Sequence, residues 1–259
     1  MITAGIDIGS VTTKVVLLEE EKVIARVITS TGVHPGLAAE KVLKEALRKV
    51  DLSRTDIGYI VSTGYGRRTI EFGNRSITEI SAAAKGASYS SLSTKDRVRT
   101  VIDLGGQDSK VISLDKETRV VDFVMNDRCA AGTGRFLETM TAVLGVNLED
   151  LGELSLKAKT PTQISSICTV FAESEVISLI AQGKSKEDII AGLHNSIAEK
   201  ICGMISKVGA REIICFVGGG AKNIGVKKAI EDILQMKVWI PKEPQFVIAL
   251  GAALIAKEK

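Results

Sequence analysis

Two aspartates follow short apolar runs and precede glycine turns, a placement that suits phosphate chemistry. Asp7 is followed by Gly9, and Asp103 is followed by Gly105 and Gly106. A carboxylate at such a strand end can hold Mg²⁺ through the ion's water ligands, while the N–H groups of the turn bind phosphate oxygens. The simpler alternative is that each aspartate only caps its turn. We favour Mg²⁺ binding because the same arrangement occurs twice.

The two aspartates belong to a repeated segment. The sequence GIDIGSVTTKVVLL contains Asp7 and VIDLGGQDSKVISL contains Asp103, and the comparison sets Lys14 one place from Lys110. A repeat of roughly 96 residues is far longer than a solenoid period, so it indicates a duplicated domain. Two unrelated hairpins are the less favoured alternative.

Two polar residues of the second turn are candidates for a hydrolytic step. Gln107 could orient an attacking water, as glutamines do in other phosphate hydrolases. Asp108 is the rival, since a carboxylate at this place could act as the base. A polar turn residue without a catalytic role is an equally good interpretation of Gln107. The sequence leaves this assignment open.

Two of the four cysteines have a setting that suits metal binding. Cys129 and Cys168 follow polar residues and precede predicted helix starts, where the helix dipole lowers the pKa of a thiol. Cys202 and Cys215 lie in apolar patterns, and we interpret them as core residues. Because a buried cysteine is usually an inert small hydrophobe, that interpretation is the alternative for the first pair as well.

Composition limits the class of protein. The chain has 259 residues, 45% of them hydrophobic, and a net charge of +3, which allows two lobes and indicates no nucleic-acid surface. No apolar run reaches the roughly 18 residues of a membrane span, and no signal-peptide pattern is present, so we expect a cytoplasmic protein without disulfides. Two histidines disfavour a catalytic triad and a multi-histidine metal site.

The predicted elements place these residues at strand ends and helix starts. One antiparallel meander covers residues 2–8, 13–18 and 23–29, and a second begins at residue 101 and ends near residue 126. Helices are predicted over residues 36–50, 77–87, 131–144, 147–157, 169–181, 185–208 and 246–257, and further strands over residues 57–62 and 213–217. Gly218, Gly219 and Gly220 then precede a helix near Lys222, which is a general anion-binding pattern. Small residues in the last helix predict close packing against another backbone.

The combined pattern resembles the actin, sugar kinase and Hsp70-like ATPases. That resemblance implies an α/β fold with two ribonuclease H-like lobes around a nucleotide cleft, one formed by residues 1–96 and 244–259 and the other by residues 97–243. The segments NDRCAAGTGRFLE and CTVFAESEVIS are more specific. They resemble the activator ATPases of (R)-2-hydroxyacyl-CoA dehydratases, in particular the 2-hydroxyglutaryl-CoA dehydratase activator, with the benzoyl-CoA reductase ATPase subunits as relatives.

The resemblance implies a set of nucleotide-binding residues for ATP or ADP. The phosphate loops match residues 7–14 and 103–110, and the adenosine loop matches residues 217–223. The expected binding residues are Gly9, Ser10, Thr12, Thr13, Lys14, Gly105, Gly106, Gln107, Lys110, Gly132, Gly134, Gly218, Gly219, Gly220, Ala221, Lys222 and Gln245. This chain departs from the family pattern at Ala82 and Ala83, where relatives often carry a Cys-His pair. It departs again at Lys222, where an uncharged polar residue is expected.

The resemblance also implies an iron-sulfur cluster. Two thiolates cannot complete the four-cysteine shell of a [4Fe-4S] cluster, but a two-fold homodimer can supply four. Cys129 and Cys168 of each chain would then share one cluster at the dimer axis. The implied activity is ATP-driven delivery of one electron to a 2-hydroxyacyl-CoA dehydratase, with reduced ferredoxin or flavodoxin as the donor. Gly132 and Gly134 would connect the nucleotide lobe to the cysteine segment.

Two other functions fit the same superfamily. A small-molecule kinase of the sugar kinase type would phosphorylate a substrate and would need a carboxylate base, for which Asp108 is the one candidate in view. A nucleotide-gated scaffold without a cluster would have incidental cysteines. A phosphorylated sugar product would favour the kinase, whereas a brown, oxygen-sensitive dimer would favour the activator.

Overall fold

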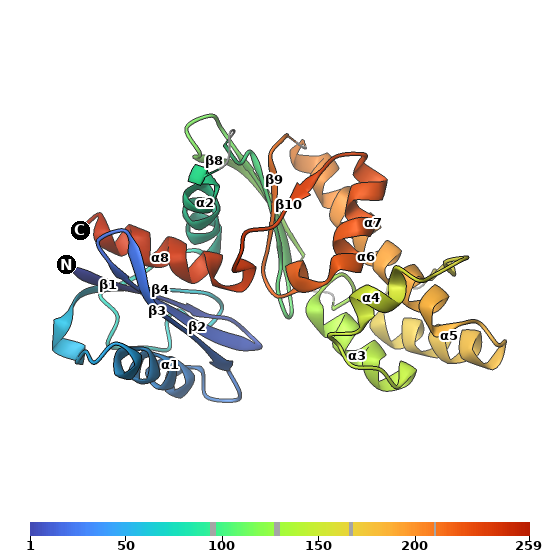
Figure 1. Ribbon diagram of the computed structural model, residues 1–259, viewed down its shortest axis with the longest axis horizontal. Helices are drawn as coiled ribbons and strands as arrows, with labels where there is room; N and C mark the ends of the chain where they lie inside the picture. Colours follow the sequence, from blue (N-terminus) through green and yellow to red (C-terminus); the bar gives the residue numbers. More distant parts are fainter. Residues whose placement is uncertain (94–96, 127–129, 166–167, 210) are drawn as a thin grey trace.

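The chain forms two five-stranded sheets with helices packed on their faces (Figure 1). The computed structural model describes residues 1–93, 97–126, 130–165, 168–209 and 211–259. In chain order the elements, with η for a 3-10 helix, are β1 (Ile2–Ile8), β2 (Thr12–Glu19), β3 (Lys22–Ser30), α1 (Pro35–Lys49), η1 (Arg54–Asp56), β4 (Ile57–Thr63), β5 (Arg75–Ser76), α2 (Glu79–Ser90), η2 (Ser91–Ser93), β6 (Thr100–Leu104), β7 (Ser109–Leu114), β8 (Val120–Asn126), α3 (Gly134–Leu144), α4 (Leu151–Ser155), α5 (Thr169–Ala181), α6 (Lys186–Val208), β9 (Ile214–Val217), η3 (Gly220–Lys222), α7 (Ile224–Leu234), β10 (Val238–Trp239), η4 (Pro244–Phe246) and α8 (Val247–Lys257).

The first sheet has the strand order β3-β2-β1-β4-β5. Short turns join β1, β2 and β3, so these strands are antiparallel, whereas β4 runs parallel to β1 after the chain has crossed over through α1. The apolar side of α1, which includes Val42 and Leu43, packs on one face of the sheet, and α8 covers the other face. The predicted meander and the predicted first helix are confirmed.

The second sheet repeats this plan with the order β10-β9-β6-β7-β8. β6, β7 and β8 are antiparallel, and β9 runs parallel to β6. All residues of β6 and β7 are buried, because α2 covers one face of these strands and α6 covers the other. Phe136 of α3 and Phe216 of β9 are fully buried in the core on the α6 side.

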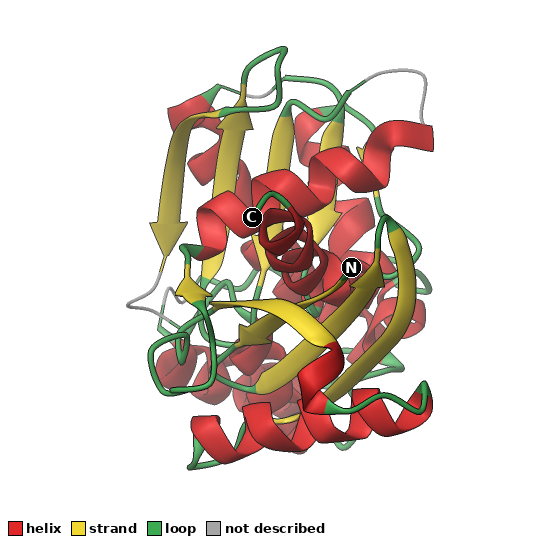
Figure 2. Cartoon of the chain, turned by 90° about the vertical axis from the view of Figure 1, so that its left-hand side faces the viewer, coloured by secondary structure: helices red, strands yellow, loops and turns green. Residues whose placement is uncertain are grey.

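Helices α2 and α8 lie between the two sheets (Figure 1), and Figure 2 shows the helix that ends at the C-terminus in this central position. Their backbones touch: a Cβ added to Gly251 would collide with the carbonyl oxygen of Ala82, and one added to Gly86 would collide with that of Val247. The predicted close approach of the last helix is therefore confirmed. Ala82 and Ala83 are fully buried in this contact, so both alanines serve helix packing.

The two meanders have the same strand register. Asp7 pairs with Lys14 across β1 and β2, and Asp103 pairs with Lys110 across β6 and β7. The two lysines are therefore equivalent, which corrects the one-place offset in the sequence comparison. The duplication also includes the strand that runs parallel to the first strand of each meander. This is β4 beside β1 in one sheet and β9 beside β6 in the other.

Some predicted elements differ in length. Helix α3 begins at Gly134 rather than near residue 131, because Gly132, with φ of +88°, lies in a turn over residues 130–133. Helix α4 covers Leu151–Ser155 instead of residues 147–157. The strands β5 and β10 have two residues each, too few to produce a recognisable pattern. Within the described ranges, no helix is long and apolar enough to cross a membrane, and the cytoplasmic location stays a prediction.

Candidate functional site

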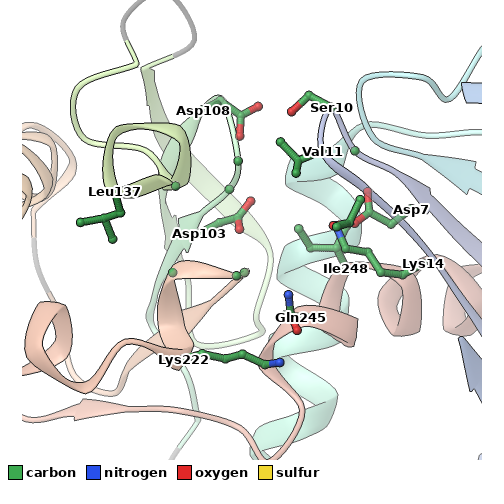
Figure 3. A pocket seen from close by; sticks show the side chains of 18 of the residues that line it. Asp7, Ser10, Val11, Lys14, Asp103, Asp108, Leu137, Lys222, Gln245 and Ile248 are labelled. Carbon is green, nitrogen blue, oxygen red and sulfur yellow. The ribbon is translucent and has the colours of Figure 1, made fainter. Parts of the chain in front are cut away.

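A cavity of about 370 Å³ lies between the two sheets, where β1, β6 and β9 end (Figure 3). Most of the residues proposed from sequence line it. They are Asp7, Gly9, Ser10, Thr12, Lys14, Asp103, Gly105, Gly106, Asp108, Lys110, Gly134, Gly218, Gly219, Gly220, Lys222 and Gln245. Its size is within the range of small-molecule sites in proteins.

The two phosphate turns are closed by the same backbone hydrogen bond. Gly9 N donates to Thr12 O at 3.1 Å, and Gly105 N donates to Asp108 O at 2.9 Å. Thr12 and Asp108 are thus equivalent positions of the duplicated turn. Figure 3 shows Ser10 and Asp108 facing each other across the cavity, so phosphates bound between the turns would be held from both sheets.

A glycine in the left-handed region lies behind each aspartate. Gly64 follows β4 with φ of +92°, and a Cβ there would lie 2.7 Å from Asp7 Oδ1. Gly218 follows β9 with φ of +86°, and a Cβ there would lie 2.5 Å from Asp103 Oδ1. Only glycine combines this backbone conformation with such a close approach. From sequence, Gly218 is expected in the adenosine loop and Gly64 has no expected role.

In the first sheet, Asp7 and Lys14 form an ion pair. Lys14 Nζ lies 3.0 Å from Asp7 Oδ2, and both side chains are largely buried at the edge of the cavity. The neighbouring Thr13 is fully buried, and its hydroxyl hydrogen-bonds to that of Thr31 at 2.9 Å. Thr13 therefore supports the turn from behind rather than lining the cavity.

In the second sheet, Lys110 is surrounded by carboxylates. Its Nζ lies 2.7 Å from Glu79 and from Asp108, and 3.4 Å from Asp103. Burial opposes the charged form of Lys110, but the three carboxylates outweigh burial and raise its pKa. Burial also dominates at Asp103 and Glu79, where it raises the pKa of each carboxyl despite the nearby ammonium group.

These charges decide where a metal ion could bind. Glu79, Asp103 and Asp108 are close enough to form a metal site, but Lys110 already occupies the space between their oxygens. Asp7 and Asp103 approach the cavity from opposite sheets (Figure 3). They are better placed to hold Mg²⁺ through its waters beside bound phosphates.

Helix α3 is fixed directly to the second phosphate turn. Gly134 N donates to Gly105 O and Arg135 N donates to Gly106 O, both at 2.8 Å. These N–H groups belong to the first turn of the helix, where no intrahelical acceptor exists. A Cβ at Gly134 would lie 3.1 Å from Gly105 O, so glycine permits this close contact. The first turn of α3 and the second phosphate turn are therefore joined by backbone hydrogen bonds.

The glycine turn after β9 forms a third wall of the cavity. Gly218 N donates to Pro244 O at 3.0 Å, which joins this turn to the segment that carries Gln245. Lys222 and Gln245 face the cavity at the end away from Ser10 and Asp108 (Figure 3). Lys222 thus introduces a positive charge at the part of the site expected to hold adenosine.

Some sequence candidates do not line the cavity. Gln107 is exposed on the outside of its turn, and Ala221 is buried. Gly132 lies in the turn before α3, where it packs on the side chain of Lys200. Val11 and Asn223 also line it and lie within the predicted loops 7–14 and 217–223, although they were not named as binding residues. The lining residues outside the predicted set are Tyr65, Glu79, Leu137, Glu138, Leu148, Glu149 and Ile248. Glu79 lies in the first turn of the helix predicted over residues 77–87, and nothing in its local pattern indicates that it meets Lys110.

The cysteines differ in their settings. Cys168 is exposed and is the N-cap residue of α5, as predicted, whereas Cys129 lies outside the described residues. Cys202 is half-buried and Cys215 is fully buried, which confirms that they are core residues. Burial raises the pKa of Cys202 to about 11 and also raises that of Cys215, so neither thiol is suited to form a thiolate ligand.

Known proteins and solved structures match this chain over nearly its whole length. A sequence model of the BadF/BadG/BcrA/BcrD ATPase family matches residues 4–256. The activator of lactoyl-CoA dehydratase from Anaerotignum propionicum is 43% identical over 259 residues, which cover 100% of this chain and 98% of that protein. The activator of the 2-hydroxyisocaproyl-CoA dehydratase from Clostridium difficile, solved with bound ADPNP, has a TM-score of 0.93 and 39% identity over 100% of this chain and 95% of its own. Component A of the (R)-2-hydroxyglutaryl-CoA dehydratase from Acidaminococcus fermentans has a TM-score of 0.94 and 39% identity over 100% of this chain and 98% of its own.

Proposed function

The chain belongs to the BadF/BadG/BcrA/BcrD ATPase family, and from this membership we propose that it is an ATP-dependent activator of a 2-hydroxyacyl-CoA dehydratase. In this proposal, ATP hydrolysis drives delivery of one electron to the dehydratase through a [4Fe-4S] cluster shared by two copies of the chain. The observation that carries it is the continuous path from the second phosphate turn through α3 to α5 and Cys168.

The cavity supports binding of ATP with Mg²⁺. Asp7, Glu79, Asp103 and Asp108 face two ammonium groups, those of Lys14 and Lys110. When all six groups are ionised, they leave a net charge of −2 where phosphates would bind. A divalent cation would offset this charge and lower the repulsion of a polyanion, and Asp7 and Asp103 would hold its water ligands.

For the hydrolytic step, we propose Asp108 as the residue that acts on the water. It lines the cavity between the two phosphate turns, while Gln107 is exposed outside it. The ammonium group of Lys110, 2.7 Å from Asp108 Oδ1, fixes the orientation of this carboxylate. The same carboxylate could serve a kinase, but the family relationship favours the activator.

Helix α5 supports a homodimer with the cysteines at its centre. It buries only Ala172 and Val176, yet it is largely apolar, so several large side chains are exposed on it. They are Val170, Phe171, Ile177 and Ile180. Covering them needs a partner, and a second copy is the simplest, because it also brings a second Cys168.

The setting of Cys168 fits a cluster ligand. Its thiol is exposed at a helix N-terminus, where the dipole favours the thiolate that binds iron. Cys168 and Cys129 of two chains would together complete the four-cysteine shell. When bound, the cluster would supply one-electron transfer at the dimer interface. Reduced ferredoxin or flavodoxin is the proposed donor.

Coupling between the nucleotide site and the dimer interface would run through contacts already described. A change at the γ-phosphate displaces the second phosphate turn, whose Gly105 and Gly106 carbonyls accept the first N–H groups of α3. Helix α3 packs on α5, which begins after Cys168. Nucleotide exchange then alters the dimer interface or its docking to the dehydratase, which requires a difference in binding between the two states.

The test is a comparison of electron transfer in two nucleotide states. The reduced protein is mixed with the dehydratase under argon, with either ATP or ADP and Mg²⁺, and oxidation is followed by absorbance. We expect transfer with ATP and little with ADP. Equal rates with both nucleotides would contradict the proposed coupling.

A further inference from the structure

His194 is a buried histidine behind the wall of the nucleotide cavity. It lies on α6, which packs against α4 and α7, and its side chain is 1% exposed. Among the described residues its Nδ1 has no hydrogen-bond partner. A Cβ at Gly225 would collide with the imidazole, so the ring is packed tightly against the start of α7. The proposed activity gives this residue no role.

The hydrogen bonds around Asn223 fix the orientation of its amide. Asn223 Oδ1 accepts hydrogen bonds from Gly225 N at 2.9 Å and Val226 N at 3.1 Å, and it thereby caps α7. The amide nitrogen must then point the other way, and it lies 3.0 Å from His194 Nε2. Because Nδ2 can only donate, Nε2 accepts and the ring hydrogen is on Nδ1.

The ring is neutral in this arrangement. Burial lowers the pKa of His194 to about 4, so an unprotonated Nε2 is available at neutral pH. The neutral ring needs no charged partner in its buried position behind the cavity wall. The imidazole therefore acts as a fixed hydrogen-bond acceptor.

Among the residues that the structure describes, no partner takes the second amide N–H of Asn223. A side-chain amide offers two N–H donors and an oxygen with two lone pairs. The oxygen is saturated by the two backbone N–H groups of α7, and one amide N–H is directed at His194. Asn223 also lines the cavity, so its second N–H is the group left to meet a bound molecule.

The position of Asn223 in the cavity indicates which part of a bound nucleotide its second N–H would meet. Lys222, the preceding residue, lies at the end of the cavity away from Ser10 and Asp108 (Figure 3). With phosphates between the two turns, that end receives the nucleoside. A hydrogen-bond acceptor there is a ribose oxygen or a ring nitrogen of the base.

We propose that His194 is a positioning residue for nucleoside recognition, holding the Asn223 amide so that its free N–H binds an acceptor on the ribose or the base. This role rests on the proposed nucleotide site. It predicts that His194 affects the binding of the nucleoside and leaves the binding of the phosphates unchanged.

A pair of variants separates these effects. His194→Leu removes the acceptor while keeping an apolar side chain of similar bulk, and His194→Gln restores an acceptor through its amide oxygen. Affinities for ADP and for inorganic tripolyphosphate, which has no nucleoside, are measured by calorimetry with Mg²⁺ on the full-length protein. We expect His194→Leu to bind ADP about tenfold more weakly, as for loss of one ordered hydrogen bond, and His194→Gln to stay within about threefold of the unmodified chain. Both should bind tripolyphosphate normally.

Other results would overturn the assignment. ADP affinity that is unchanged in His194→Leu, or an equal loss for ADP and tripolyphosphate, contradicts nucleoside recognition through Asn223. If His194→Leu does not fold, Asn223→Ser replaces it, because serine still caps α7 but has no amide N–H. Unchanged ADP affinity in that variant would also reject the role. Failure of the unmodified chain to bind ADP would instead reject the proposed function itself.

Discussion

Glu79 Oε2 lies 2.7 Å from Lys110 Nζ, so an ion pair joins α2 to the second sheet at the cavity. Helix α2 also packs on α8, which covers the first sheet. The contact therefore connects the packing between the sheets with the second phosphate turn. Both side chains are largely buried, with 18% and 2% of their surface exposed, so solvent screens the pair only weakly.

Neutralising Glu79 should increase the affinity for nucleotide in the absence of metal. Glu79→Gln removes one of the carboxylates that repel phosphate and leaves Lys110 with Asp103 and Asp108. Without Mg²⁺, we expect ADP to bind at least about threefold more tightly, which corresponds to a modest Coulomb term. Titration calorimetry in EDTA measures this. Glu117→Gln, on the exposed β7–β8 turn, is the control and should bind ADP like the unmodified chain.

Replacing Asp103 should raise the stability of the fold above acid pH and lower the rate of ATP hydrolysis. Burial raises the pKa of Asp103, so its ionisation destabilises the fold as pH rises through that pKa, and the full stability is present only at acid pH. Asp103→Asn does not titrate. Its melting temperature relative to the unmodified chain should therefore increase as pH rises above the ordinary aspartate range, while ATP hydrolysis falls by about 100-fold or more. A variant that becomes relatively less stable with rising pH would contradict the assignment of the buried carboxylate.

The two candidates for the hydrolytic water should behave differently. Asp108→Asn keeps the shape of a cavity-lining side chain but removes the base, and we expect kcat to fall about 100-fold. Gln107→Ala alters an exposed side chain and should leave kcat within about threefold. Steady-state phosphate release measures both. The opposite pattern would transfer the role to Gln107.

The glycine behind Asp103 should be irreplaceable. In Gly218→Ala, the new Cβ would lie 2.5 Å from both Asp103 Oδ1 and Leu104 O, at φ of +86°. We expect a loss of about 3 kcal/mol or more in the free energy of unfolding and loss of ADP binding. Gly183→Ala is the matched control, because Gly183 has φ of +76° with no atom within 4 Å. It should cost only about 1–2 kcal/mol and bind ADP normally.

Sequence patterns predicted the parts of the fold that rest on local periodicity. The meander from β1 to β3, the long helix α6 and the strand–glycine turn at β9 all follow from hydrophobic spacing and capping residues. The duplication was visible because Asp7 and Asp103 occupy equivalent strand ends. Their convergence on one cavity is seen in the structure, where Asp7 and Asp103 line it from opposite sheets.

The site residues that the sequence patterns did not predict depend on contacts between segments that are distant in the chain. Glu79 reaches Lys110 only because α2 packs between the sheets, and no spacing in the sequence encodes that. His194 meets Asn223 through the packing of α6 on α7. The start of α3 was misplaced because residues 130–133 have helix-compatible composition, whereas Gly132 adopts a positive φ and forms a turn.

The cluster is tested most directly by iron and sulfide analysis of the anaerobically purified protein together with its Cys168→Ala variant. Cys168 is exposed, so its replacement disturbs no packing within the chain and the variant should fold, and Cys202→Ala serves as the thiol control. We predict about four iron and four sulfide per dimer in the unmodified chain and in the control, and essentially none in Cys168→Ala. Iron retained by a folded Cys168→Ala variant would contradict a cluster held at the N-terminus of α5.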